Sequence, residues 1–273
     1  MAIKNYIKRV LPRSLARILT AISRDSSSPY SRKIDIFTPN SLSDFFVWSP
    51  FTKSTYFVAE NIHALLQGVK VDVTHSFKFF SESGELIHEE KHDSNDFFCR
   101  VKLTGIVNST GYTSFIHFVT HQGREEDSLM SIIKGNGRTV CEQNRGYCIY
   151  YPNIEFPLGA MVHGNFGGIS NEASSYAKQR AWHLYTTAYK FELNNEYDLV
   201  LNNPTSQELC VNVVLNQCKV VHSLTIKPLG TKHIRIFNYC GSMTFESRLP
   251  ICRPVIFKNP RCINTSDFDV LHA

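Results

Sequence analysis

The sequence predicts an all-β protein of two packed antiparallel β-sandwich subdomains behind a short N-terminal amphipathic helical segment. Short segments of alternating apolar and polar residues recur along the chain, polar turns separate them, and basic residues are concentrated before residue 25. Alternation with a period of two is typical of strands that bury one face. A chain of 273 residues and 31.2 kDa is long enough for one large all-β domain or two smaller ones.

The clearest strand patterns occur once in each half of the chain. In the first half, VKVDVTHSFKFF (residues 69–80) is followed by the turn SESG and then by ELIHEEK and FFCRVKL. In the second half, LCVNVVL (residues 209–215), VVHSLTI and KHIRIF are separated by the turns NQCK and KPLG. Each series predicts an antiparallel meander. A short helix is also expected at AENIHALL, residues 59–66.

The two halves share a spacing that suggests an internal duplication. Aligning His88 with His222 gives a separation of 222 − 88 = 134 residues, and Arg100 and Arg235 differ from that register by one residue. Either two related subdomains or two unrelated meanders explain this pattern, since alternation with turns is a weak fingerprint. The predicted divisions are residues 1–32 (leader and linker), 33–160 and 161–273.

Residues 2–19, AIKNYIKRVLPRSLARIL, form a basic segment without acidic residues. Apolar residues recur in it every three or four positions, which predicts two short amphipathic helices, the second beginning at Pro12. Three roles stay open: binding to an anionic membrane surface, a mitochondrial transit peptide, or packing on the body. The basic residues that would contact a membrane are Lys4, Lys8, Arg9, Arg13 and Arg17.

The net charge of +5 comes from this leader. Residues 1–24 hold six basic residues and no acidic ones, so residues 25–273 hold 29 − 6 = 23 basic and 24 acidic residues. A nucleic-acid groove needs clustered Lys and Arg in the body, so nucleic acid is not an expected partner. The eight cysteines include no C-x-x-C pair, and the leader lacks the apolar centre of a signal peptide; we therefore expect reduced thiols and a cytoplasmic protein.

A Gly-, Pro- and Tyr-rich stretch, GYCIYYPNIEFPLGAMVHGNFGG (residues 146–168), lies between the halves. Irregular connections on a rigid scaffold often carry binding sites, and aromatic rings with polar tips suit stacking on sugars. A glycine-rich bend and rings packed in the core are the alternative interpretation. The candidate ligand-binding residues are His163, Asn165, Tyr147, Tyr150, Tyr151 and Trp182.

Histidines on several predicted strands raise the alternative of a metal centre. His117 and His121 share one face of SFIHFVTH, and His75 and His163 lie in other strand-like segments, so three or four imidazoles can meet and bind zinc or iron. The sequence has no H-E-x-x-H motif to support this, and buried histidines with a hydrogen-bond partner are common. We therefore expect no cofactor, with zinc or iron as the alternative.

Two stretches, IKNYIKRVLPRSLARIL (residues 3–19) and SDFFVWSPFTKSTYFVAENIHALLQG (residues 43–68), carry a resemblance. They resemble uncharacterised accessory proteins encoded in bacterial loci for cell-surface polysaccharide biosynthesis, such as lipopolysaccharide and capsule. The resemblance implies a setting, sugar-polymer assembly at the inner face of a membrane, and transfers no active-site residue.

These observations predict an accessory or carbohydrate-recognition protein in surface-polysaccharide assembly, peripheral to the cytoplasmic face of the membrane, and they leave enzymatic activity open. The expected partners are a carbohydrate or nucleotide-sugar-related ligand and an anionic membrane surface. Two alternatives stay open. One is a histidine-based, metal-dependent enzyme on a β-sandwich scaffold, and the other is a scaffolding protein without a small ligand.

Overall fold

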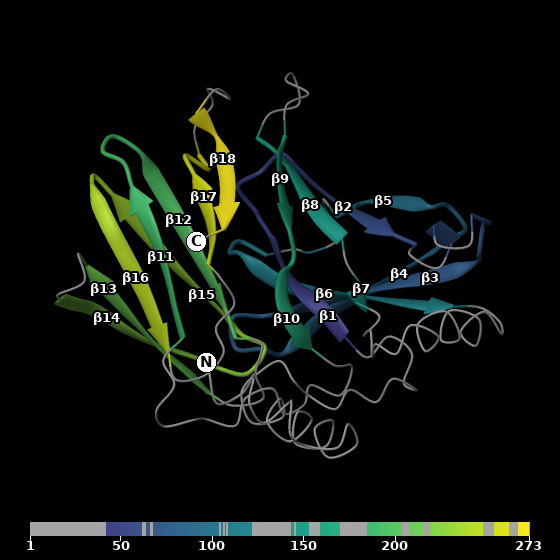
Figure 1. Cartoon of the computed structure of the whole chain (residues 1–273), viewed down its shortest axis with the longest axis horizontal. Helices are drawn as coiled ribbons and strands as arrows, with labels where there is room; N and C mark the ends of the chain where they lie inside the picture. The colour runs from purple at the N-terminus through teal and green to yellow at the C-terminus, as the bar shows by residue number, and fades with distance from the viewer. Residues whose placement is uncertain are drawn as a thin grey trace, which may run out of the picture. The chain divides into compact units, whose positions relative to one another are not determined.

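The computed structural model describes residues 42–61, 64–65, 68–103, 105, 107, 109–121, 143–144, 146–152, 159–169, 185–203, 208–215, 219–247, 254–261 and 267–272 (Figure 1). The chain divides into two compact units, Met1–Ile34 and Asp35–Ala273. The predicted leader helices, linker and membrane-contacting residues lie outside the described residues. The described part is nearly all β, which confirms the predicted class, with a helical turn at Ala64 and Leu65 whose first N–H is capped by the Asn61 side chain.

Strands account for most of the described residues. They are β1 (Leu42–Trp48), β2 (Ser54–Glu60), β3 (Val73–Phe80), β4 (Leu86–Ser94), β5 (Phe98–Lys102), β6 (Thr113–His121), β7 (Gln143–Asn144), β8 (Gly146–Tyr151), β9 (Ala160–His163), β10 (Asn165–Ile169), β11 (Tyr185–Phe191), β12 (Glu196–Asn202), β13 (Leu209–Leu215), β14 (Lys219–Ile226), β15 (Thr231–Phe237), β16 (Gly241–Ser247), β17 (Val255–Lys258) and β18 (Asp269–His272).

Four sheets contain these strands. Sheet A has the order β10-β1-β6-β3-β4 with β7 beside β1, sheet B has β5-β2-β8-β9, sheet C has β11-β16-β13-β14, and sheet D has β15-β12-β17-β18. Neighbouring strands are antiparallel except for the parallel pair of β1 and β7. β9 contains both residues 160 and 161, between which a domain boundary is predicted, so that boundary divides a strand of sheet B.

The strand order of the first half recurs in the second. With β7 and β10 set aside, sheets A and C both have the order first-sixth-third-fourth, and sheets B and D both have fifth-second-seventh-eighth. A register shift strengthens the match. It follows the pair Phe79 and His88 between β3 and β4, and it follows the pair Val213 and His222 between β13 and β14. The two histidines aligned from the sequence therefore occupy the same place in the two halves.

Aromatic rings from sheets A and B meet in one buried cluster. Phe57 on β2 lies 4.7 Å from Phe46 on β1, 5.3 Å from Phe77 on β3 and 5.8 Å from Phe115 on β6, measured between ring centroids. All four side chains are buried. The alternation predicted for residues 69–80 is confirmed, because Val73, His75, Phe77 and Phe79 are all fully buried. Ring contacts of this kind stabilise beyond the area that they bury.

Strand β12 of sheet D is buried on both of its faces, whereas β15 beside it exposes His233, Arg235 and Phe237. On β12, the residues from Tyr197 to Asn202 are all buried. Tyr197 contacts Phe191 of sheet C at 4.9 Å, whereas Val200 and Phe257, whose strands are β12 and β17, belong to the same cluster as the rings of sheets A and B. The two halves therefore share part of one core through the outer face of sheet D.

A buried carboxylate lies at this junction. Asp198 on β12 is fully buried, and its oxygens lie 2.7 Å from the Tyr112 hydroxyl, 2.9 Å from His233 Nε2 and 2.9 Å from Arg261 Nη2. Burial by itself raises the pKa of Asp198, but these three donors outweigh it and hold the pKa below its usual value. Asp198 therefore stays ionised and joins Tyr112 of the first half to the second half.

We expect Asp198→Asn to lower the free energy of unfolding in urea by about 3–5 kcal/mol, because the variant removes the buried member of an ion pair and leaves Arg261 paired with Glu196 alone. Asp96→Asn is the matched control, since its pair with Lys70 at 3.0 Å is exposed and such pairs contribute about 0–1 kcal/mol. Because the folded pKa of Asp198 is lowered, its contribution is present above about pH 4 and is lost as the pH falls below that value. Equal effects of the two variants would contradict this account.

Candidate functional site

The outer face of sheet B brings several sequence-predicted residues together. On its strands, buried residues that face sheet A alternate with outward-facing ones, so that Phe98 and Met161 are 54% and 56% exposed whereas Cys99 and Val162 are buried. We call the outward-facing set the sheet B face. It consists of Tyr56, Val58, Phe98, Arg100, Lys102, Tyr147, Ile149, Tyr151, Met161 and His163.

The register arranges these side chains in rows across the sheet. One row runs from Arg100 on β5 through Val58 on β2 and Tyr147 on β8 to His163 on β9. The next row holds Lys102, Tyr56, Ile149 and Met161 in the same strand order. Neighbouring strands lie about 4.8 Å apart, so each row offers a flat strip of rings and charges.

Arg100 is the best-positioned polar group on the sheet B face. Its guanidinium carbon lies 4.1 Å from the centre of the Tyr56 ring, and its Nη2 donates a hydrogen bond of 3.3 Å to the Tyr151 hydroxyl. The Tyr56 and Tyr151 rings meet edge to face at 5.7 Å. These contacts restrict the long arginine side chain before any ligand arrives, which lowers the entropy lost on binding.

The far end of the same row holds Tyr147 and His163, whose rings meet edge to face at 5.9 Å. His163 is exposed, and its backbone carbonyl accepts a hydrogen bond of 2.7 Å from His272 Nε2 on β18. This bond links the edges of sheets B and D. The arrangement leaves the imidazole of His163 and the hydroxyl of Tyr147 at the surface of one strip.

The other predicted ligand residues lie elsewhere. Tyr150 points into the core, where its hydroxyl donates to the carbonyl of Val47, and burial followed by the nearby Cys148 raises its pKa well above the usual value. The backbone of Asn165 lies in β10 opposite Phe45, and Trp182 lies outside the described residues. Sequence analysis missed Tyr56, Phe98, Arg100 and Lys102, although alternation on β2 and β5 places them on the outer face.

The predicted histidine cluster is formed in part. His75 Nδ1 and His117 Nε2 lie 3.0 Å apart in the core, with their rings stacked and both side chains fully buried. His163 lies on the sheet B face, and His121 lies in β6 opposite Val73. Among the described residues, no three or more His, Cys, Asp or Glu side chains are grouped so as to hold a metal ion. The zinc or iron hypothesis stays a prediction.

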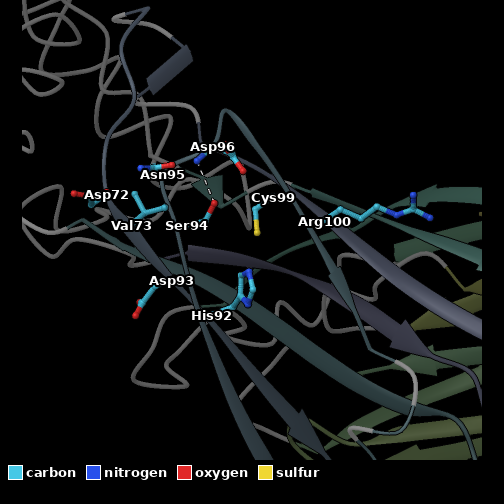
Figure 2. Close-up of a pocket in the computed structure, with 9 residues that line it drawn as sticks. All are labelled: Asp72, Val73, His92, Asp93, Ser94, Asn95, Asp96, Cys99 and Arg100. Atoms are coloured by element: carbon cyan, nitrogen blue, oxygen red, sulfur yellow. Dashed lines mark hydrogen bonds between the residues drawn. The ribbon is translucent and has the colours of Figure 1, made fainter.

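A cavity of about 540 Å³ lies at the meeting of β4 and β5. Figure 2 shows the Cys99 thiol and the His92 ring directed toward each other, whereas Arg100 points away. Burial, aided by Asp96 and opposed by a bond from Ser94, raises the pKa of Cys99, so the thiol is not an activated nucleophile. The cavity is lined by Asp72, Val73, His92, Asp93, Ser94, Asn95, Asp96, Cys99 and Arg100.

No family model matches this chain, and no significant match to it was found among the curated proteins or the solved structures. Within the described residues, no helix is both long and apolar enough to cross a membrane.

The buried histidine pair predicts a loss of stability in weak acid. Burial and then the charge of a protonated His75 lower the pKa of His117 well below its usual value of 6.5. Below about pH 6.5 the unfolded chain binds a proton at His117 that the folded chain does not bind. The free energy of unfolding should therefore decrease as the pH falls, by up to about 1.4 kcal/mol per pH unit for this proton. The measurement is urea unfolding between pH 7.5 and 5, with His117→Gln as the variant that removes the titration.

An NMR titration of the imidazole protons provides the control. In the folded protein the His117 ring should remain neutral down to pH 5, and in the same sample in urea it should titrate at the usual value. Protonation of folded His117 near pH 6.5 would contradict the buried pair.

Proposed function

We propose that the protein is a carbohydrate-recognition or accessory protein in the assembly of a cell-surface polysaccharide, and that the sheet B face binds the sugar. The observation that carries this proposal is the strip in which Tyr56 and Tyr151 hold Arg100 in place and Tyr147 lies two strands away in the same row as Arg100. Sugar rings offer apolar C–H faces to aromatic rings and hydroxyls to charged and amide groups. The sheet B face provides both kinds of group within adjacent rows.

The sheet B face extends across four strands, which suits an extended ligand. Residues on adjacent strands project from one twisted plane, so a polymer can cross several strands and contact each row in turn. A small substrate needs a concave site instead. The cavity beside β4 and β5 offers neither an activated thiol nor a metal-ligand group among the described residues. These features favour recognition over catalysis.

We infer that sheets A with B and C with D are two β-sandwiches derived from one eight-stranded unit. The equal strand orders and the equal register shifts beside His88 and His222 support this inference. The contacts of Phe57 with rings of sheet A and of Tyr197 with Phe191 of sheet C support the packing within each half. In this arrangement the outer side of sheet D is covered at β12 and β17 but exposed at β15, whereas sheet B exposes residues on β5 and β9.

The setting that we propose is the cytoplasmic face of a membrane, with the basic leader as the attachment. The support is the charge distribution, six basic and no acidic residues in residues 1–24, together with the sequence resemblance to accessory proteins of polysaccharide loci. Each base near an anionic surface contributes about 1 kcal/mol. A nearly neutral body then leaves the sheet B face free for its ligand.

Sugar binding should depend on the tyrosines of the sheet B face. With a panel of lipopolysaccharide and capsule oligosaccharides, measured by titration calorimetry, Tyr147→Ala and Tyr151→Ala should each weaken the affinity of the best ligand by about tenfold, since one ring contact contributes about 1.4 kcal/mol. Phe237→Ala is the control, because Phe237 is a 52% exposed ring on β15 of sheet D. An affinity that neither tyrosine variant changes, or no binding of any oligosaccharide, would contradict the proposal.

Membrane attachment through the leader should weaken as salt increases. The full chain should sediment with vesicles that contain phosphatidylglycerol at low salt and be released near 0.5 M NaCl, because exposed charges are screened at that ionic strength. A chain that starts at Lys33 should stay in the supernatant under both conditions. Equal binding of the two chains would refute this role of residues 1–32.

A further inference from the structure

The two halves can be compared position by position along the outer faces of sheets B and D. β2 and β12 are both seven residues long, and a buried Asn follows each strand. The backbone N–H of Asn61 donates to the carbonyl of Phe97, just before β5. In the same way, the backbone N–H of Asn203 donates to the carbonyl of Gly230, just before β15. Asn61 therefore corresponds to Asn203, a separation of 203 − 61 = 142 residues.

This separation fixes the partners of the other strands. Val58 of β2 corresponds to Val200 of β12, and the residue opposite each one on the next strand is Arg100 and His233, respectively. On the other side, the row that contains Val58 ends at His163, and the row that contains Val200 ends at His272. The counterpart of Arg100 is thus His233, which corrects the alignment of Arg100 with Arg235 made from the sequence by two positions.

In sheet D, the basic residues at these positions lie beside carboxylates of β12. His233 lies 2.9 Å from Asp198, and the Nε of Arg235 lies 2.7 Å from Glu196. Arg261 also bridges Asp198 and Glu196. The carboxylates on the outer face of sheet D are therefore paired with basic residues of the same chain, as the burial of Asp198 requires.

In sheet B, the two corresponding positions on β5 also carry basic residues, but the two corresponding positions on β2 carry no carboxylate. Arg100 and Lys102 stand where His233 and Arg235 stand, whereas Tyr56 replaces Asp198 and Ser54 replaces Glu196. Within the described residues, no carboxylate forms an ion pair with Arg100 or Lys102. The acid on the outer side of β2 is Glu60, and it lies opposite Phe98 in a different row. The sheet B face thus has two cations, Arg100 and Lys102, at positions whose counterparts in sheet D lie beside carboxylates.

We propose that the sheet B face recognises an acidic sugar, whose anionic group takes the place of the two missing carboxylates beside Arg100 and Lys102. This inference rests on the proposed carbohydrate function and names its ligand class. The fork of Arg100 binds a carboxylate or a phosphate through two parallel hydrogen bonds, and Tyr56 and Tyr151 hold that fork in place. The flanking rings of Tyr147 and Tyr151 then contact the sugar itself.

The test compares each acidic sugar with its own neutral form. The full-length protein is titrated with tetragalacturonate and its carboxyl-reduced form, and with a phosphorylated mannose oligosaccharide and its dephosphorylated form. We expect at least tenfold tighter binding of one acidic form than of its neutral form. The carboxylate and phosphate arms identify the source of the anion. Arg100→Gln and Lys102→Gln should abolish the difference, and Lys91→Gln on β4, which removes an exposed lysine outside the face, should retain it.

Four outcomes overturn the inference, in different ways. Equal binding of acidic and neutral forms that depends on Tyr147 keeps the carbohydrate function and refutes the acidic ligand. A preference that survives Arg100→Gln with Lys102→Gln refutes the position of the anion. Displacement of the acidic sugar by inorganic polyphosphate, with no effect of Tyr147→Ala, identifies a general polyanion surface. Binding of none of the four oligosaccharides refutes these acidic sugars as ligands.

Discussion

The arrangement of the described sheets depends on the burial of β12, in sheet D, between sheet C on one side and the core of sheets A and B on the other. A sheet covered on one face can place its polar residues in water, but β12 has no solvent-facing side between Tyr197 and Asn202. The carboxylate of Asp198 is tolerated there because a phenol, an imidazole and a guanidinium all point at it. That network fixes where Tyr112 of the first half meets the second half.

The comparison of the two outer faces explains how one architecture can have two roles. The face of sheet D has exchanged exposed rings for aliphatic residues and paired charges, such as Val255 and Asp198, and it packs against the first half. At the corresponding places the face of sheet B has Tyr147 and Tyr56. In the proposed function, one outer sheet serves contact between the halves and the other serves recognition, because a few side chains differ while the strand order is the same.

Periodicity alone predicted the β class and the inward side of β3, and turn residues located SESG and KPLG, since both signals are local. The ligand candidates stay predictions, but the structure shows which of them share a face. Tyr147, Tyr151 and His163 share the sheet B face, whereas Tyr150 does not, because side chains on adjacent residues of a strand point to opposite faces. Arg100 and Tyr56 were missed because they are 44 residues apart in the chain (100 − 56 = 44) and meet only through the pairing of β2 with β5.

The sequence by itself determined the β class, the turns SESG and KPLG and the basic composition of residues 1–24, because each depends on neighbours along the chain. It left the correspondence of His88 with His222 open beside two unrelated meanders, and the equal strand orders and register shifts support the correspondence. Only the tertiary structure decided that His75 and His117 stack in the core, that Asp198 is buried, and that sheet B presents an exposed aromatic and basic face. These features arise from strand order and from the packing of one sheet on another, and the pattern of a single strand is the same whether its outer face meets water or another sheet.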